Sequence, residues 1–565
     1  MTRALRRRWP DLAALVAYVL LSTAYLWPLV RRFSTEMAGD GFDRYVFQWT
    51  NWWVTRALSH GQSPYHTEMM FHPRGVDLHF LSFSWLNTFV WWPLQALGGD
   101  LTAYNFTVWW SWPLAGFGAY LLGREVFGDR RASFVAGLVY AFYPYHFAQR
   151  NHLNLLSIQW IPFSLLYLIR AMRSGRRLDG CLSGLFFACS GLSGWHLMTL
   201  SGMLGGMWLL YGWLTERSEW SKGAGRASMA LVVTAGLLTG PLLAPLVYKI
   251  ATNPETQAID LGKETETQTD LAAYILPNLY HPLWGHLAAP IHGRFLRNKD
   301  HSVALGYVPL ALVGYGLLNW RKDDRVRFWL VGLLIFWLLA LGPFPRINGE
   351  PYSRVPLPYR LVGWSFPVRS LRNPERFNII VGLCLSVVVG VSTVRVLSGL
   401  SRRRTTTAFV VMSALVLLEY WSWPFPTRPA DVPDVYREIA AEPGEFAIVD
   451  LPISNDLSKQ YMVYQIVHRK ATVTGHVSRP PDGAYDFIEA NDLLHSMQQG
   501  RRPDPEGDPE ANLSALADAG VRYLAIHKEQ LSDEELAALE AYLPTPLLYA
   551  GERVLIYPTR LDTGQ

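Results

Sequence analysis

Two aspartates in a short glycine-containing segment are the first candidates for chemistry. The segment reads GDGFDRY at 39–45 and contains Asp40 and Asp43. Glycines on both sides of Asp40 allow a tight turn and leave its carboxylate uncrowded, so it could take a proton from a hydroxyl group. Asp43 falls at the start of a predicted surface helix, where its charge also complements the helix N-terminus. We interpret both as candidate catalytic residues, and a structural role stays open for each.

Three arginines form a second candidate group. They are Arg369, Arg372 and Arg376 in RSLRNPER at 369–376, just before an apolar stretch. Their guanidinium groups suit phosphate, which they bind through paired hydrogen bonds. The competing interpretation is a loop anchor in which an arginine pairs with Glu375.

A polar loop, QRNHLNLLSIQW at 149–160, supplies Arg150, His152 and Asn154 but no acidic residue. His152 could bind a phosphate or a hydroxyl group, or it could cap a helix. The three cysteines all lie inside apolar stretches, and the histidines follow no metal-ligand spacing. We therefore predict no metal-binding residues.

Long apolar stretches must position these groups. The chain has 565 residues, of which 50% are hydrophobic and only 17% charged, whereas soluble proteins carry about 25% charged residues. A membrane-spanning helix needs about 20 apolar residues. The candidate spans are 11–30, 101–122, 132–148, 157–172, 180–197, 198–214, 228–250, 302–319, 328–342, 377–397 and 406–423. The stretch 180–214 is too long for one helix, and Gly194 marks the expected break.

The arginine clusters test this count of about eleven spans. Clusters at 3–8, 124–131, 170–177, 217–226, 321–327 and 402–404 should be cytoplasmic by the positive-inside rule. Eleven spans place all of them on one side, provided that 43–58 and 80–97 are interfacial helices on the outer face. Asp40 and the arginines at 369–376 then share the outer side, so membrane orientation does not explain these arginines. Because the basic residues form short clusters between apolar stretches, they do not indicate a nucleic-acid partner.

A soluble domain follows the last span. We divide the chain into a transmembrane domain, 1–424, and an extracytoplasmic α/β domain, 425–565. Strands are predicted at 446–451, 521–526 and 553–557, and helices at 509–519 and 532–543, the latter with Ser532 as N-cap and Glu535 three residues on. Asp450, His468, His476 and His527 form no recognisable triad, and we expect them to be structural.

Several stretches resemble the GT-C superfamily of integral-membrane glycosyltransferases, and more closely a group of bacterial GT-C-like membrane proteins. These stretches are GDGFDRYVFQW (39–49), FHPRGVDL (71–78), the segment 104–163, LRNPERF (371–377) and GVRYLAIH (520–527). The resemblance extends over nearly the whole chain, although each motif alone is of low specificity. It implies a polytopic α-helical GT-C-like fold with a small C-terminal α/β domain.

The resemblance also implies an activity, namely inverting transfer of a sugar from a polyprenyl-phosphate donor to an acceptor hydroxyl at the outer face of the cytoplasmic membrane. Asp40 matches the first-loop carboxylate that acts as general base. The arginines at 369–376 would hold the donor phosphate, and Arg150, His152, Asn154 and His72 would bind substrate. The expected partners are the lipid bilayer, the polyprenyl-phosphate sugar and a glycan, lipid or protein acceptor.

One departure concerns the second acidic residue that many GT-C enzymes carry after the third span. The loop 149–160 has none. Asp40 and Asp43 alone would supply few ligands for magnesium or manganese. A divalent cation therefore stays an open question. Two other functions also stay open: a non-catalytic binding or assembly protein that acts through its C-terminal domain, and a transporter of lipid-linked glycans.

Overall fold

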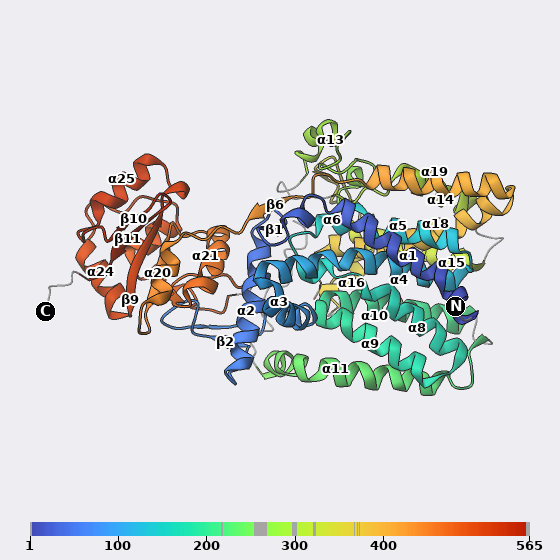
Figure 1. The fold of residues 1–565 in the computed structure, drawn as a ribbon, viewed down its shortest axis with the longest axis horizontal. Helices are drawn as coiled ribbons and strands as arrows, with labels where there is room; N and C mark the ends of the chain where they lie inside the picture. Colours follow the sequence, from blue (N-terminus) through green and yellow to red (C-terminus); the bar gives the residue numbers. More distant parts are fainter. Residues whose placement is uncertain are drawn as a thin grey trace. The chain divides into compact units, whose positions relative to one another are not determined.

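The computed structural model describes residues 3–215, 219–252, 268–295, 302–319, 324–365, 368–369, 371, 373–478 and 480–560. The chain forms two compact units (Figure 1). The first comprises residues 1–39 and 84–428, and the second comprises residues 40–83 and 429–565. Residues 40–83, which we predicted as part of the transmembrane domain, thus belong to the same unit as the C-terminal domain. Hydrogen bonds between residues 69–72 and Thr472 explain this grouping.

The first unit is a helical bundle. Its helices are α1 (Arg3–Tyr25), η1 (Leu29–Arg32), α3 (Trp85–Trp109), α4 (Ser111–Phe127), α5 (Arg130–Phe142), α6 (Pro144–Ala148), α7 (Leu153–Leu156), α8 (Trp160–Ser174), α9 (Arg177–Ser193), α10 (Trp195–Thr215), α11 (Ala224–Thr252), η4 (Leu271–Tyr274), α13 (Gly285–His292), α14 (Tyr307–Leu318), α15 (Asp324–Ala340), α16 (Tyr359–Val362), η7 (Pro374–Phe377), α18 (Asn378–Ser398) and α19 (Arg402–Tyr420). The long helices run alongside one another (Figure 1). The short strands are β1 (Glu36–Ala38), β4 (Arg346–Ile347), β5 (Glu350–Pro351) and β6 (Thr427–Pro429), which pair as β1–β6 and β4–β5.

A helix corresponds to each of the eleven predicted spans. Among the described residues, four helical segments are long and apolar enough to cross a membrane: 153–174, 195–215, 224–252 and 374–398. Helix α18 is mostly buried by its neighbours, whereas α11 exposes apolar side chains such as Leu237 and Met229. This contrast is expected of a central helix and a peripheral one in a bundle surrounded by lipid.

Local sequence explains where the helices break. Gly194 has an extended backbone and separates α9 from α10, as predicted. Gly99, with φ of 81°, interrupts α3 between the predicted interfacial segment 80–97 and the predicted span 101–122, which covers the end of α3 and most of α4. Pro113 lacks the N–H that would bond to the carbonyl of Trp109, which accounts for the interruption between α3 and α4. The predicted span 132–148 ends at Tyr143 because Pro144 follows.

The arginine-rich helix ends meet at one end of the bundle, which we call the arginine end. Asp11 near the start of α1 pairs with Arg124 at the end of α4 and with Arg130 at the start of α5. Glu125 pairs with Arg170 at the end of α8, 2.7 Å away. With eleven spans, the arginine clusters were predicted to lie on one side of the membrane, and these ion pairs agree with that prediction for α1, α4, α5 and α8. Which side of the membrane this end faces stays a prediction.

The second unit is built on a mixed five-stranded sheet. Its elements are α2 (Asp43–Ser59), β2 (His66–Thr67), β3 (Val76–Asp77), α20 (Val435–Ala441), β7 (Ala447–Leu451), α21 (Asn455–His468), β8 (Ala471–Thr472), α22 (Asp486–Glu489), α23 (Asp492–Gln498), α24 (Pro509–Asp518), β9 (Val521–His527), η8 (Lys528–Gln530), α25 (Asp533–Tyr542), β10 (Tyr549–Ala550) and β11 (Val554–Pro558). The strand order is β10-β11-β9-β7-β8, and β7 runs parallel to both of its neighbours. All three predicted strands and both predicted helices of this domain are confirmed, including the capping box of Ser532 and Glu535.

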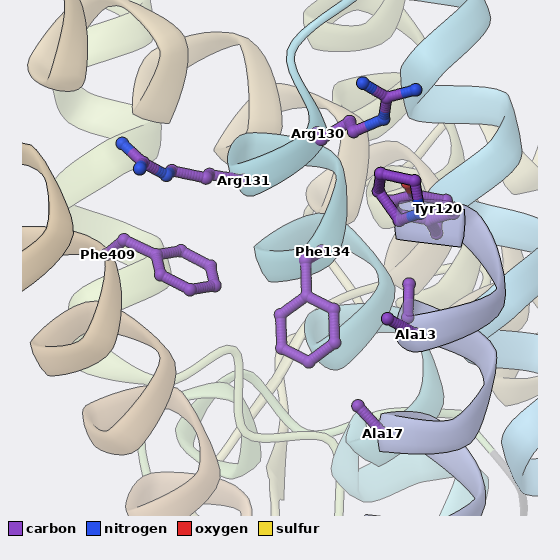
Figure 2. Close-up of a pocket in the computed structure, with 9 residues that line it drawn as sticks. Ala13, Ala17, Tyr120, Arg130, Arg131, Phe134 and Phe409 are labelled. Carbon is purple, nitrogen blue, oxygen red and sulfur yellow. The ribbon is translucent and has the colours of Figure 1, made fainter. Parts of the chain in front are cut away.

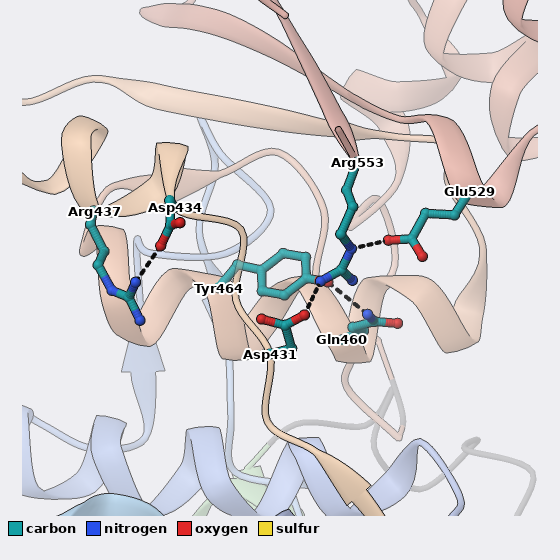
Figure 3. A network of polar contacts seen from close by, with 7 residues as sticks. All are labelled: Asp431, Asp434, Arg437, Gln460, Tyr464, Glu529 and Arg553. Carbon is teal, nitrogen blue, oxygen red and sulfur yellow. Dashed lines mark hydrogen bonds and ion pairs between the residues drawn. The ribbon is translucent and has the colours of Figure 1, made fainter. Parts of the chain in front are cut away.

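An ion-pair network joins the segment before α20 to the sheet of this unit (Figure 3). Arg553, the residue before β11, pairs with both Asp431 and Glu529. Beside it, Gln460 donates a hydrogen bond of 2.6 Å to the hydroxyl of Tyr464 on α21. The sheet itself packs around apolar residues such as Val449, Leu524 and Leu555, and the polar network orders the segment that leads into α20.

Candidate functional site

Helix α3 fixes the segment that leads to Asp40. Asn105, which is fully buried, donates from its side-chain amide to the carbonyls of Phe33 and Glu36 and accepts from the backbone N–H of Ala38 at 2.9 Å. Sequence reasoning missed Asn105. The signal was available, because a single amide inside an apolar span requires hydrogen-bond partners and so indicates a specific contact.

Gly39 brings the same segment against the loop 149–154. Its backbone N–H donates to the carbonyl of Pro426 at 2.9 Å, and its φ is 94°. A Cβ atom on Gly39 would lie 2.3 Å from the Oδ1 atom of Asn151 and 3.3 Å from the carbonyl oxygen of Arg150. Only glycine therefore fits at this position, and the peptide bond that follows it leads to Asp40.

Arg150 is held by aromatic rings in the first unit. Its guanidinium donates to the Tyr280 hydroxyl at 3.0 Å and lies 4.7 Å from that ring and 4.9 Å from the ring of Phe147. Arg150 is only 4% exposed, and these contacts fix the orientation of its planar guanidinium group. Such a group is suited to a phosphate or a sugar oxygen.

His152 and Asn154 lie in the same loop, as N-cap and second residue of α7. Asn154 is buried, and its backbone carbonyl packs against Gly194, where a Cβ atom would approach it to 2.5 Å. The break between α9 and α10 therefore supports this loop. The predicted substrate-binding roles of His152 and Asn154 stay predictions.

The arginines at 369–376 have different surroundings. Arg369 is exposed, and Arg372 lies outside the described residues. Arg376 donates to the carbonyl of Leu371 at 2.6 Å, which curls the chain back before α18. Tyr145 on α6 is close enough to Arg376 to interact with it electrostatically. The first unit thus holds Arg376 and the α6–α7 region at the same end of the bundle, opposite the arginine end.

In the second unit, Asp43 is engaged by a lysine. Asp40 is half-buried just before α2, and Asp43 is the first residue of that helix. The Nζ atom of Lys459 lies 2.9 Å from Asp43 and 3.0 Å from Asp456, and the lysine side chain is only 7% exposed. This ion pair gives Asp43 a structural role in joining α2 to α21, so Asp40 becomes the stronger candidate for a general base.

Replacing Lys459 by methionine should destabilise the second unit. Methionine keeps the apolar stem but leaves Asp43 without its cation, so we expect a loss of about 1–3 kcal/mol. Urea-dependent proteolysis of the full-length protein, followed at fragments from this unit, measures the change. Asp456→Asn is the control, because Asp456 is 59% exposed and its loss should cost under about 0.5 kcal/mol. Equal effects of the two substitutions would contradict the pairing.

His72 lies in the second unit and bonds within it. Its Nε2 atom is 2.6 Å from the carbonyl oxygen of Ala519. At this distance the ring nitrogen donates a hydrogen bond to the carbonyl. The predicted substrate-binding role of His72 remains untested, and this bond supports a structural one.

The donor set does not fit a divalent cation. Among the described residues, no three His, Cys, Asp or Glu side chains gather as a metal site would require. Of the two aspartates considered for such a site, Asp43 is already paired with Lys459. We therefore derive no step through a metal.

A buried polar cluster in the second unit brings together Asp450 and His527, two residues that we expected to be structural. Asp450 at the end of β7 lies 2.9 Å from the Nε2 atom of His527, and both contact the Tyr436 hydroxyl. All three side chains are buried, and the His527 ring stacks on Tyr461 at 4.6 Å. Because the cluster is enclosed by side chains of its own unit, it supports the expected structural role.

His468 at the end of α21 predicts a pH dependence. Burial lowers its pKa to about 4, against 6.5 for an exposed histidine. Below pH 6.5 the unfolded chain therefore binds a proton that the folded unit does not. The contribution of neutral His468 to stability is fully present above pH 6.5 and is lost as the pH falls toward 4. The loss is about 3 kcal/mol. In thermal unfolding of the full chain, the Tm of this unit should be lower at pH 4.5 than at pH 7, and His468→Asn should reduce that difference in Tm. An unchanged difference would contradict this assignment.

Comparison with known proteins gives a fold but no family by sequence. No protein-family model matches the chain, and no curated protein matches it. Among solved structures, it is similar to the arabinofuranosyltransferase AftD from Mycobacteria, with a TM-score of 0.60 and 15% identity over 99% of this chain and 40% of that one. It is also similar to the Archaeoglobus fulgidus oligosaccharyltransferase in the apo form, with a TM-score of 0.56 and 13% identity over 95% of this chain and 72% of that one.

The same oligosaccharyltransferase tethered to an acceptor peptide containing the NVT sequon gives a TM-score of 0.54 and 12% identity, over 99% of this chain and 74% of that one. The chain spans less than half the length of AftD. These likenesses cover both the helical bundle and the C-terminal α/β domain. The chain therefore has the GT-C fold of integral-membrane glycosyltransferases.

Proposed function

We propose that this protein is a membrane glycosyltransferase that transfers a sugar from a polyprenyl-phosphate donor to an acceptor hydroxyl at the outer face of the cytoplasmic membrane. The solved structures with this fold include an arabinofuranosyltransferase and an oligosaccharyltransferase. Their activities support glycosyl transfer as the reaction class. The donor and acceptor are part of the proposal.

The observation that carries the proposal is the anchoring of Gly39. The Asn105 side chain and the Pro426 carbonyl hold the segment up to Gly39 by hydrogen bonds to its backbone, and Gly39 packs against Asn151. The backbone just before Asp40 is therefore held in place at Gly39, beside the loop that carries Arg150. Rigid elements of this kind are what a catalytic carboxylate needs, because a displacement of about 1 Å can cost 100-fold in rate.

In the proposed reaction, Asp40 takes the proton of the acceptor hydroxyl as its oxygen attacks the anomeric carbon of the donor sugar. The bond from that carbon to the phosphate oxygen breaks, and its electron pair leaves with the lipid phosphate. The attack comes from the face opposite the leaving group, so the anomeric configuration inverts. Arg369, Arg372 and Arg376 are proposed to neutralise the phosphate, and Arg150, His152 and Asn154 to bind the sugar or the acceptor.

The direct test is donor cleavage by the purified full-length protein. We expect a radiolabelled polyprenyl-phosphate sugar to be consumed when acceptor-containing membrane extract is present. Free polyprenyl phosphate should inhibit the reaction, whereas polyprenyl alcohol should not. If no donor in a panel of pentose and hexose derivatives is bound or consumed, the non-catalytic alternative replaces this proposal.

Orientation provides a second test. The proposal requires Asp40 and Arg372 to face the same compartment. Single cysteines at positions 40 and 372, labelled in sealed vesicles by a membrane-impermeant reagent, should react from the same side. Labelling from opposite sides would exclude the assigned roles.

A further inference from the structure

At the arginine end of the bundle, α1 leaves a groove against α5 and α19 (Figure 2). Pro10, Ala13, Ala14 and Ala17 share one face of α1, at spacings of three and four residues. Because these side chains are short, they do not fill the space beside Phe134 and Phe409. The result is a cavity of about 200 Å³.

The groove is accessible from the lipid-facing side of α1. Ala13 itself is exposed, and the neighbouring Leu12, Val16 and Leu20 are each about half exposed or more. Exposed apolar side chains on a bundle helix are expected to face hydrocarbon. An acyl chain could therefore enter the groove without crossing a polar surface.

Two arginines stand at one end of the groove. Figure 2 shows Arg130 and Arg131 beyond the rings of Phe134 and Phe409. Both belong to the first turn of α5, where a positive charge opposes the helix dipole. Cations at this position therefore do not stabilise the helix, and an anion placed there would interact favourably with the arginines.

Three arginines and two aspartates of the described residues stand together at this end of the groove, namely Arg124, Arg130 and Arg131 with Asp11 and Asp129. Asp11 is shared between Arg124 and Arg130. The side chain of Asp129 accepts from the backbone N–H of Ala132 and caps α5. Arg131 donates to the Thr406 hydroxyl at 3.4 Å, which is a neutral partner. Counted over these five side chains, the mouth of the groove carries a net positive charge next to an apolar channel.

We propose that this groove binds an anionic phospholipid, with one acyl chain between α1, α5 and α19 and the phosphate at Arg130 and Arg131. An apolar channel with a cationic mouth fits a lipid with an anionic headgroup better than a soluble anion, which would leave the channel unfilled. The site lies at the end of the bundle opposite Arg150 and Arg376, and it is independent of the proposed transfer reaction.

The test is lipid binding to the full-length protein in detergent, measured by native mass spectrometry with dioleoylphosphatidylglycerol and dioleoylphosphatidylcholine. We expect preferential retention of the anionic lipid. The double variant Arg130→Gln/Arg131→Gln should bind it at least about tenfold more weakly, because both phosphate contacts are lost. Ala17→Phe should also weaken binding, because its ring fills the groove while the charge is unchanged.

A matched control removes the same charge elsewhere at this end. Arg176 and Arg177 are exposed, stand at the start of α9 and do not line the groove. Arg176→Gln/Arg177→Gln should retain wild-type lipid binding. Equal loss in the two double variants would show a diffuse charge effect and overturn the proposal, as would wild-type binding by Arg130→Gln/Arg131→Gln. Displacement of the phospholipid by equimolar polyprenyl phosphate would instead assign the groove to the donor lipid.

Discussion

Asp40→Asn is expected to lower the rate of sugar transfer by about 10²–10⁴-fold, which is the usual contribution of a positioned general base. Asparagine has nearly the same shape but cannot accept the proton of the acceptor hydroxyl. Binding of the donor should change by less than about twofold, because the proposed phosphate contacts come from arginines. Single-turnover transfer with saturating donor separates these two quantities.

Two further carboxylates in the same part of the sequence make the test specific. Glu36→Gln is the control, since Glu36 pairs with Arg32 at 3.1 Å as a partly exposed i,i+4 pair and has no proposed role in transfer. Asp43→Asn distinguishes the two candidate aspartates. If Asp43→Asn abolishes transfer while Asp40→Asn retains it, the ion pair with Lys459 does not define the role of Asp43, and the base has been assigned to the wrong residue.

Local sequence patterns were sufficient to predict the helices and most of the C-terminal domain. Apolar stretches of fixed length, the break at Gly194 and the capping box at Ser532 each depend on residues within a few positions of one another. The shared end of the clusters at 124–131 and 170–177 was predictable as well, because the positive-inside rule places basic loops together.

Long-range contacts of the candidate site could not be predicted in this way. Trp49 on α2 donates to Gln465 on α21 at 2.7 Å, across a separation of 416 residues. Neither residue carries a local signal for the other, so residues 40–83 were assigned to the transmembrane domain when they pack with the C-terminal domain. The ion pair of Asp43 with Lys459 was missed for the same reason. Asn105 differs, because a buried amide in an apolar helix indicated a partner without identifying it.

Gly39→Ala tests whether the fixed entry to Asp40 matters for catalysis. Alanine at φ of 94° is strained by about 1–2 kcal/mol, and its Cβ atom would lie 2.3 Å from the side-chain oxygen of Asn151. The segment must then shift, and the Asp40 carboxylate shifts with it. We expect kcat to fall about 100-fold with a smaller change in KM, because positioning rather than substrate binding is lost.

Backbone strain and displacement can be separated with two more variants. Gly61 also has a positive φ, 67°, but no atom lies within 4 Å of an added Cβ atom, so Gly61→Ala reports strain alone and should leave transfer within about threefold. Adding Asn151→Gly to Gly39→Ala removes the closest clash and should restore part of the lost activity, a coupling that a double-mutant cycle measures. If Gly39→Ala and Gly61→Ala behave alike, contact with the loop 149–154 does not position Asp40, and the proposed mechanism loses the structural feature on which it depends.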